Sequence, residues 1–207
     1  MMWALLSKRT QLILASSTVL VCAFGLEMLV QFFTGQSIHL IKLISAVATA
    51  VLLVLVPAAY FLFRQILKRW PILQKLTFPD LNGAWEGYLT TTWVDPETGN
   101  NPEPIPATVR INQTLFGIHV SLETDESVSD SAQEVLETDR KAGKYRVWYR
   151  YDNSPKAAVR HRSPNHGGLA FLEMHWEKDS NLLTGRYFTD RKTTGDITLR
   201  RVPDMVG

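Results

Sequence analysis

The sequence contains one cysteine, which excludes an intramolecular disulfide bond and a zinc site built from several thiolates. Cys22 lies in an apolar stretch, where we expect it to pack, and the lack of disulfides suits a reducing cytoplasmic compartment. The histidines show no HxxxH spacing, and GxSxG and phosphate-loop patterns are missing. These absences argue against a metal, a cofactor or a nucleophilic active site, so we expect no enzymatic activity.

Two segments near the start of the chain have almost no charge. Leu12 to Phe33 contains one charged residue, Glu27, and Leu43 to Phe63 contains none. Each is close to the ~20 residues that a helix needs to cross a bilayer. The sequence therefore predicts a transmembrane helical hairpin in residues 1–69, with spans at about 12–33 and 43–63.

Basic residues flank the hairpin on its outer ends. The connection between the spans holds only His39 and Lys42, whereas the two ends carry Lys8, Arg9, Arg64, Lys68 and Arg69. Lysine and arginine beside a span resist translocation, so both termini of this multi-pass arrangement are expected in the cytoplasm. The first apolar stretch is too long for the core of a signal peptide.

The remainder of the chain has a different composition. Six of the 22 Lys and Arg residues but only one of the 20 acidic residues lie in residues 1–69, so the later part is slightly acidic. Trp70 and Pro71 open a short linker, residues 70–80, because tryptophan suits a membrane interface and proline ends helices. A cytoplasmic ligand-binding domain is then expected in residues 81–207.

From Leu81 onward the hydrophobic period is close to two. Seven segments are rich in aromatic and β-branched residues and end at Gly, Pro, Asn or Asp, and residues 157–162 could supply an eighth strand. Strands that follow one another without helices favour an up-and-down barrel. We therefore predict a membrane-anchored, mainly β protein with a roughly eight-stranded β-barrel. The acidic segment 123–139 is expected to be a short helix or a mobile loop.

Aromatic and polar residues mix at two predicted strand ends. By alternation, Tyr149, Tyr151 and Asn153 share one face of their strand. Aromatic rings in a barrel are commonly core residues. Rings beside hydroxyl, amide and guanidinium groups are nevertheless what a nucleotide-sized anionic ligand requires, because bases stack and phosphates accept hydrogen bonds. The second strand end places Tyr187, Thr189 and Arg191 on one face.

Three features of the chain belong together: a two-helix anchor, the segment LNGAWEGYL that opens a β-rich domain, and the segment LTGRYFTDRKTTGDITL that closes it. In this combination the chain resembles the two-transmembrane, β-strand-rich effectors of bacterial cyclic-oligonucleotide-based antiphage signalling systems (CBASS). The resemblance implies an inner-membrane protein whose cytoplasmic barrel binds a cyclic dinucleotide from a partner nucleotidyltransferase, with no DNA or RNA partner. It further implies ligand-driven homo-oligomerisation and disruption of the lipid bilayer. The ligand contacts that it implies are Tyr187, Thr189, Arg191 and Thr194.

Two other functions fit the same architecture. A membrane-tethered, lipocalin-like carrier or sensor of an apolar small molecule would also open with a tryptophan-bearing strand, and its barrel should enclose an apolar cavity. A structural scaffold without a ligand should have a barrel filled by side chains. The lining of the barrel therefore distinguishes these functions.

Glu27 is a candidate effector residue within the membrane. A carboxylate in hydrocarbon is expensive, and such residues are functional by default. Gln31 lies one turn further along the same helical face, so several copies could line a polar seam. The alternative is that Glu27 reaches the membrane interface and has no special role.

Overall fold

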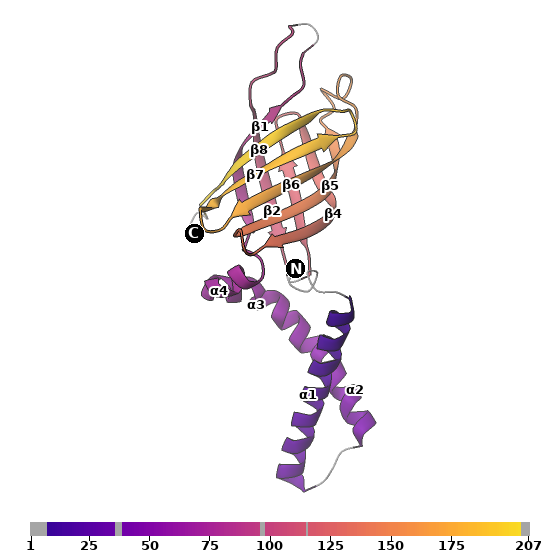
Figure 1. The fold of residues 1–207 in the computed structure, drawn as a ribbon. Helices are drawn as coiled ribbons and strands as arrows, with labels where there is room; N and C mark the ends of the chain where they lie inside the picture. The colour runs from indigo at the N-terminus through magenta and orange to yellow at the C-terminus, as the bar shows by residue number, and fades with distance from the viewer. Residues whose placement is uncertain (1–7, 36–38, 96–97, 115, 204–207) are drawn as a thin grey trace.

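In the computed structural model, a β-barrel stands above a group of helices (Figure 1). The structure describes residues 8–35, 39–95, 98–114 and 116–203. The strands follow one another along the chain after the helices, in the order that the change of hydrophobic period predicts. The protein is therefore mainly β, with its long helices confined to the first part of the chain.

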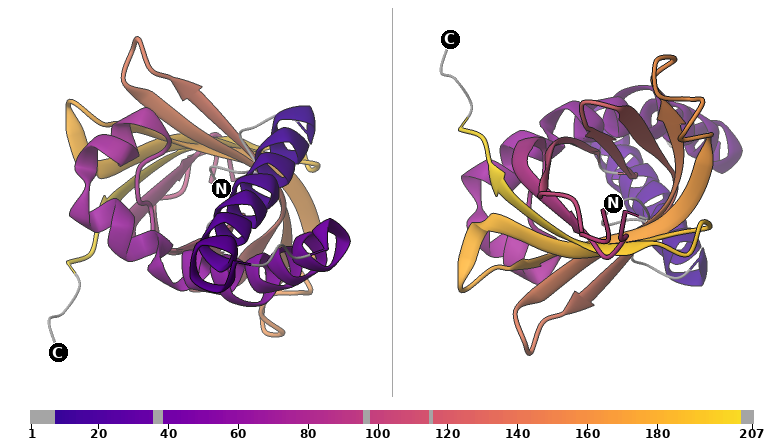
Figure 2. Two further views of the ribbon diagram at one scale, coloured as in Figure 1. Left: turned by 90° about the horizontal axis from the view of Figure 1, so that it is seen from below. Right: turned by 90° about the horizontal axis from the view of Figure 1, so that it is seen from above.

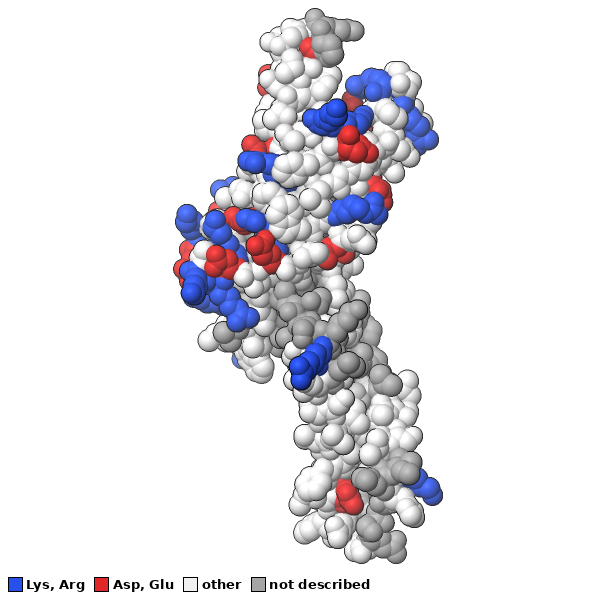
Figure 3. All heavy atoms as spheres, turned by 45° about the vertical axis from the view of Figure 1, so that its right-hand side comes forward, with Lys and Arg blue, Asp and Glu red and all other residues white. Residues whose placement is uncertain are grey.

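The first helix, α1 (Lys8–Thr34), contains the first of the two apolar segments. Its stretch Arg9–Thr34 is long and apolar enough to cross a membrane. Many of its apolar side chains are exposed, and Phe32 is 82% exposed. On the face shown in Figure 3, the described residues of the helices carry few charges, in contrast to the barrel. By length and composition, α1 is suited to a lipid environment.

The second predicted span lies in a helical run that is interrupted. This run consists of α2 (Leu40–Ala50), a π-helical turn η2 (Val51–Leu55) and α3 (Val56–Arg69). Pro57 lacks an amide N–H, so regular helical bonding is broken next to it. With 11 and 14 residues, α2 and α3 are each too short to cross a bilayer alone. The hairpin helices pack where Ala23 meets Leu43 and Val47.

Eight strands form a closed barrel, and each strand pairs antiparallel with its neighbours in sequence, with β8 closing onto β1. Figure 2 shows the ring of strands from above and from below. This is the up-and-down barrel that the alternating segments predict. The strands are β1 (Gly83–Thr91), β2 (Ile105–Gln113), β3 (Ile118–Glu123), β4 (Ser127–Asp139), β5 (Lys144–Pro155), β6 (His166–His175), β7 (Asp179–Thr189) and β8 (Thr194–Arg201).

Apolar side chains fill the half of the barrel that is nearest the helices. Trp85, Val109, Val147, Leu172 and Leu199 have no exposed surface, and each comes from a different strand. All belong to one core cluster, and along β2 and β5 the buried positions alternate with more exposed ones. This half of the barrel is a packed core, not a ligand cavity.

The segment before β1 closes this end of the barrel. Residues 70–80, expected to be a linker, contain the short helix α4 (Pro71–Leu76) and part of the core. Phe78 is fully buried, and its ring meets the Tyr145 ring edge-on at 5.6 Å between centroids. The Tyr145 hydroxyl donates a hydrogen bond of 2.6 Å to the Lys75 carbonyl. The segment therefore belongs to the folded domain.

Polar contacts join the same segment to α3 and to the barrel. The Gln74 amide donates to the Leu67 carbonyl of α3 at 2.9 Å, and its oxygen accepts the Asp80 N–H at 3.0 Å. Arg201 of β8 donates to the carbonyls of Asp80 and Asn82 at 2.6 and 2.7 Å. The barrel and the end of the helical run are thus connected by a structured segment.

Two assignments within the barrel differ from the predictions. The acidic segment 123–139 is neither a helix nor a loop: after a turn at residues 124–126 it forms β4, which pairs with β5 along its length. Residues 157–162 are not a strand but form turns closed by bonds such as Val159 N–H to Lys156 O at 3.0 Å. The eighth strand is therefore β4, whose acids face solvent while β5 supplies its hydrogen-bond partners.

Candidate functional site

The predicted ligand contacts lie on one wall of the barrel, β5 to β8, at the end far from the helices (Figure 1). Pairing places Tyr149, Ala170, Tyr187 and Gly195 in one row across these strands. Tyr151, Gly168 and Thr189 form the next row towards the open end. We call this part of the wall the rim. The pairing of β5 and β7 with β6 therefore brings the two predicted strand ends, which are far apart in sequence, close together.

Tyr149, Tyr151 and Asn153 face the interior, in agreement with the alternation of β5. Tyr149 is 3% exposed and belongs to the core, where its ring lies 6.2 Å from that of Tyr151. Burial raises the pKa of Tyr149 and raises the pKa of Tyr151 to about 12. A tyrosine hydroxyl is already protonated at neutral pH, and these shifts keep both hydroxyls neutral donors to still higher pH.

Two glycines make room for the rim tyrosines. A Cβ atom at Gly168 would collide with the Tyr151 hydroxyl and with the Phe188 carbonyl. A Cβ atom at Gly195 would collide with the Tyr187 ring. Tyr187 is half-buried, and burial raises its pKa. The rings of Tyr151 and Tyr187 therefore pack directly against the backbone of neighbouring strands, and this packing fixes their positions.

A chain of polar contacts crosses the rim from β4 to the β7–β8 turn. The Ser129 hydroxyl donates to the Asn153 amide oxygen at 2.7 Å, and the Asn153 amide nitrogen lies 3.3 Å from Nδ1 of His166. Nε2 of His166 accepts a hydrogen bond of 3.0 Å from Arg191. Burial lowers the pKa of His166, which keeps the imidazole neutral as this acceptor. Nδ1 of this neutral ring carries the proton and lies 3.2 Å from the Pro164 carbonyl, so His166 is oriented to hold the Arg191 guanidinium at the edge of the barrel.

Two of the predicted contacts lie away from the inner face. β7 ends at Thr189, so Arg191 lies in the following turn, where its exposed guanidinium also reaches Ser163 at 3.4 and 3.5 Å. Thr194 pairs with the outward-facing Phe188, and its hydroxyl lies 3.0 Å from that of Thr92. The structure therefore places Tyr187 and Thr189 on the inner face and Arg191 and Thr194 at the edge.

Three residues that take part in the polar contacts at the rim were not predicted from the sequence. His166, Ser129 and Ser163 come from β6, β4 and the β5–β6 connection. His166 stands directly opposite Asn153 in the β5–β6 pairing. The sequence contains no signal for this contact, because it depends on the strand register and on the length of the connection.

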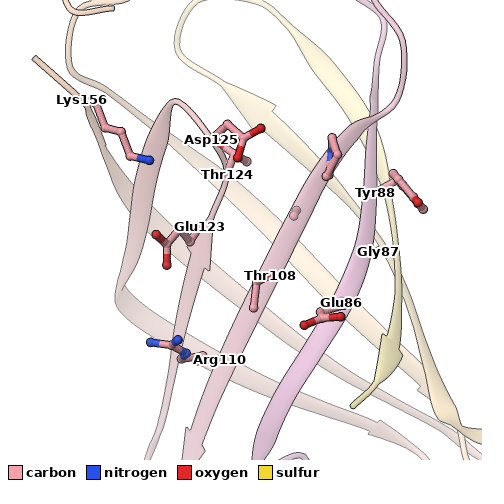
Figure 4. Close-up of a pocket in the computed structure, with 11 residues that line it drawn as sticks. Glu86, Gly87, Tyr88, Thr108, Arg110, Glu123, Thr124, Asp125 and Lys156 are labelled. Carbon is pink, nitrogen blue, oxygen red and sulfur yellow. The ribbon is translucent and has the colours of Figure 1, made fainter. Parts of the chain in front are cut away.

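A separate groove of about 600 Å³ lies on the outer face of β1, β2 and β3. Glu86 and Glu123 lie on either side of Thr108 (Figure 4). Its charged side chains form no ion pair among the described residues, and no predicted ligand contact lines it. The charged residues of the groove are Glu86, Arg110, Glu123, Asp125 and Lys156.

The candidate membrane residues lie on α1. Glu27 is partly buried and Gln31 is exposed, one helical turn apart. Within the described part of the chain, no group of three or more His, Cys, Asp or Glu side chains is arranged to hold a metal ion.

Comparison with known proteins adds two findings. A family model described as "Cap15, cyclic dinucleotide receptor domain" matches residues 76–201, which is more than half of the chain. CD-NTase-associated protein 15 of Staphylococcus schleiferi is 33% identical over 95 residues, which cover 45% of this chain and 48% of that protein. The similarity therefore spans about half the length of this relative.

Proposed function

The chain belongs to the Cap15 cyclic dinucleotide receptor domain family, and on this premise we propose that its barrel binds a cyclic dinucleotide at the rim of β5 to β8. The observation that carries this proposal is the rim itself. It combines a half-buried tyrosine, Tyr187, with neutral hydroxyl and amide donors and the guanidinium of Arg191. A nucleotide offers bases for stacking and phosphates for charge-assisted hydrogen bonds.

The lining of the barrel favours this ligand over an apolar one. A carrier of an apolar molecule needs a cavity lined mainly by apolar side chains. Here the packed core extends from the closed end as far as Tyr151, and the polar residues beyond it at the rim are the buried Asn153 and the partly exposed Thr189. The polar rim also argues against a scaffold without a ligand.

We further propose that the ligand acts by driving assembly in the bilayer. α1 and the run α2–η2–α3 would together form the membrane hairpin of an inner-membrane protein, with both termini in the cytoplasm. A ligand that binds the assembled state more tightly shifts the population towards it, by no more than its differential affinity. Assembled hairpins would disrupt the membrane of an infected cell. The ligand would come from a partner nucleotidyltransferase.

Replacing Arg191 tests the location of the site. Arg191→Ala should weaken binding of a cyclic dinucleotide by about 1.5–3 kcal/mol, the usual contribution of a hydrogen bond to a charged group. Titration calorimetry measures this change. Arg110→Ala is the matched control, because Arg110 lies in the outer groove. If Arg110→Ala weakened binding and Arg191→Ala did not, the ligand would occupy the groove and the rim would be the wrong site.

Glu27 tests the membrane part of the proposal. Glu27→Leu should leave insertion and ligand affinity unchanged and reduce ligand-dependent release of dye from vesicles, because the polar seam would lose its carboxylates. Glu27→Gln keeps a polar group and should retain more of the release. Equal release from all three proteins would make Glu27 an interfacial residue without a role in leakage.

A further inference from the structure

Lys192 has an unusual backbone conformation. Its φ is 63°, and it is the one non-glycine residue with positive φ in the part of the chain that the structure describes. It lies in the turn between β7 and β8. The Lys192 N–H donates to the Thr189 carbonyl at 3.1 Å, and the Thr189 N–H donates to the Thr193 carbonyl at 2.9 Å. The left-handed residue is therefore required by a closed, hydrogen-bonded turn.

Lysine is an unfavourable choice for this conformation. A side chain with a Cβ atom is strained at positive φ, whereas glycine adopts it freely and asparagine and aspartate tolerate it. A residue kept in a disfavoured conformation at a functional site often serves the function and not the fold. Here the strained residue stands at the rim, directly after Arg191.

The rest of the turn is held in place, which leaves the lysine in a fixed position. The Asp190 carboxylate accepts the Gly167 N–H at 3.1 Å, and the Asp190 N–H donates to the Gly167 carbonyl at 3.0 Å. These two bonds attach the turn to the first residues of β6. The Lys192 side chain therefore extends from an ordered turn.

The two cations of the turn differ in what they contact. Arg191 is already hydrogen-bonded to His166 and Ser163. The Lys192 ammonium group is exposed and makes neither an ion pair nor a hydrogen bond within the described residues. A cyclic dinucleotide carries two phosphates, so one cation alone would leave one phosphate without a charged partner.

We propose, on the basis of the proposed function, that Lys192 is a second phosphate contact of the ligand site and is retained in its left-handed conformation for binding. Arg191, positioned by His166, would contact one phosphate, and Lys192 would contact the other. Ammonium groups bind phosphate as mobile point charges, which suits a side chain that extends from a rigid turn.

Substitution of Lys192 by glycine should weaken ligand binding without lowering stability. In the full-length protein in detergent, Lys192→Gly should leave the Tm unchanged or raise it by up to about 2–4 °C, since relief of strain is partly offset by the freedom of glycine in the unfolded chain. The same variant should bind the cyclic dinucleotide about tenfold more weakly, with a smaller dependence on salt. Lys192→Arg keeps the charge and should retain affinity within about threefold.

The possible outcomes separate this inference from the proposed function. Equal affinity of Lys192→Gly and the wild type, with weaker binding of Arg191→Ala, would exclude Lys192 as a contact and leave the proposed function intact. A lower Tm together with weaker binding in Lys192→Gly would indicate a structural role and overturn the inference. A wild-type protein that bound no cyclic dinucleotide would contradict both.

Discussion

Deleting residues 1–69 should abolish membrane leakage and cell death completely while leaving the affinity for the ligand unchanged. The barrel has its own core cluster, and among the residues whose side chains are described this cluster begins at Phe78, after the last helix. The fragment that begins at Trp70 keeps α4 and the bond from the Tyr145 hydroxyl to Lys75, and it loses the bond from Gln74 to Leu67. A barrel without the apolar helices has no means of perturbing a bilayer.

This truncation is measured in two assays. Calorimetry compares the ligand affinity of the fragment with that of the full-length protein, and co-expression with the ligand synthase measures toxicity in cells. The matched control is the full-length protein with Arg191→Ala, which should insert into the membrane but respond weakly to the ligand. A fragment that still killed cells would show that the helices are not the effector.

Replacing Trp85 by alanine should lower the free energy of unfolding by about 3–5 kcal/mol, the usual cost of removing a large aromatic side chain from a core. Trp85 has no exposed surface, and its indole N–H donates to the Leu81 carbonyl at 3.0 Å. The Arg201 guanidinium lies 4.2 Å from the centre of its ring. The substitution would therefore disturb the packed end of the barrel and the segment that closes it.

Trp85→Phe is the matched control, because it keeps an aromatic ring and loses only the indole N–H and part of the volume. We expect a loss of about 1–3 kcal/mol for this variant, which leaves the Leu81 carbonyl without its partner. Denaturant unfolding followed by circular dichroism gives both values. A loss below about 1 kcal/mol for Trp85→Ala would mean that this end of the barrel is not the main core.

Alternation predicted seven of the strands but not β4. Where one face of a strand is buried, as in β5 with its regular pattern around Tyr145 and Val147, apolar residues recur at every second position. β4 is mostly exposed, and it is stabilised by pairing with β5. Its acids therefore resemble a loop in the sequence. The eighth strand predicted in residues 157–162 was wrong, because local turn bonds determine the conformation there.

The ligand rim was predicted only where it follows the period of a strand. Tyr149, Tyr151 and Asn153 share a face because β5 continues to Pro155. Alternation also placed Arg191 on a strand face, but this residue lies beyond the last residue of β7, where the alternation no longer applies. His166 reaches the rim through the β5–β6 register, which sequence alone does not determine. The π-helical turn that interrupts the second predicted span was also not predicted, although Pro57 follows it closely in the sequence.

The most direct test is calorimetric titration of the full-length protein in detergent with a panel of cyclic dinucleotides, alongside Arg191→Ala. We predict that at least one member of the panel binds with a micromolar or lower dissociation constant, and that Arg191→Ala weakens this binding at least tenfold. No heat of binding with any member of the panel, or identical affinities for the two proteins, would contradict a cyclic dinucleotide site at the rim.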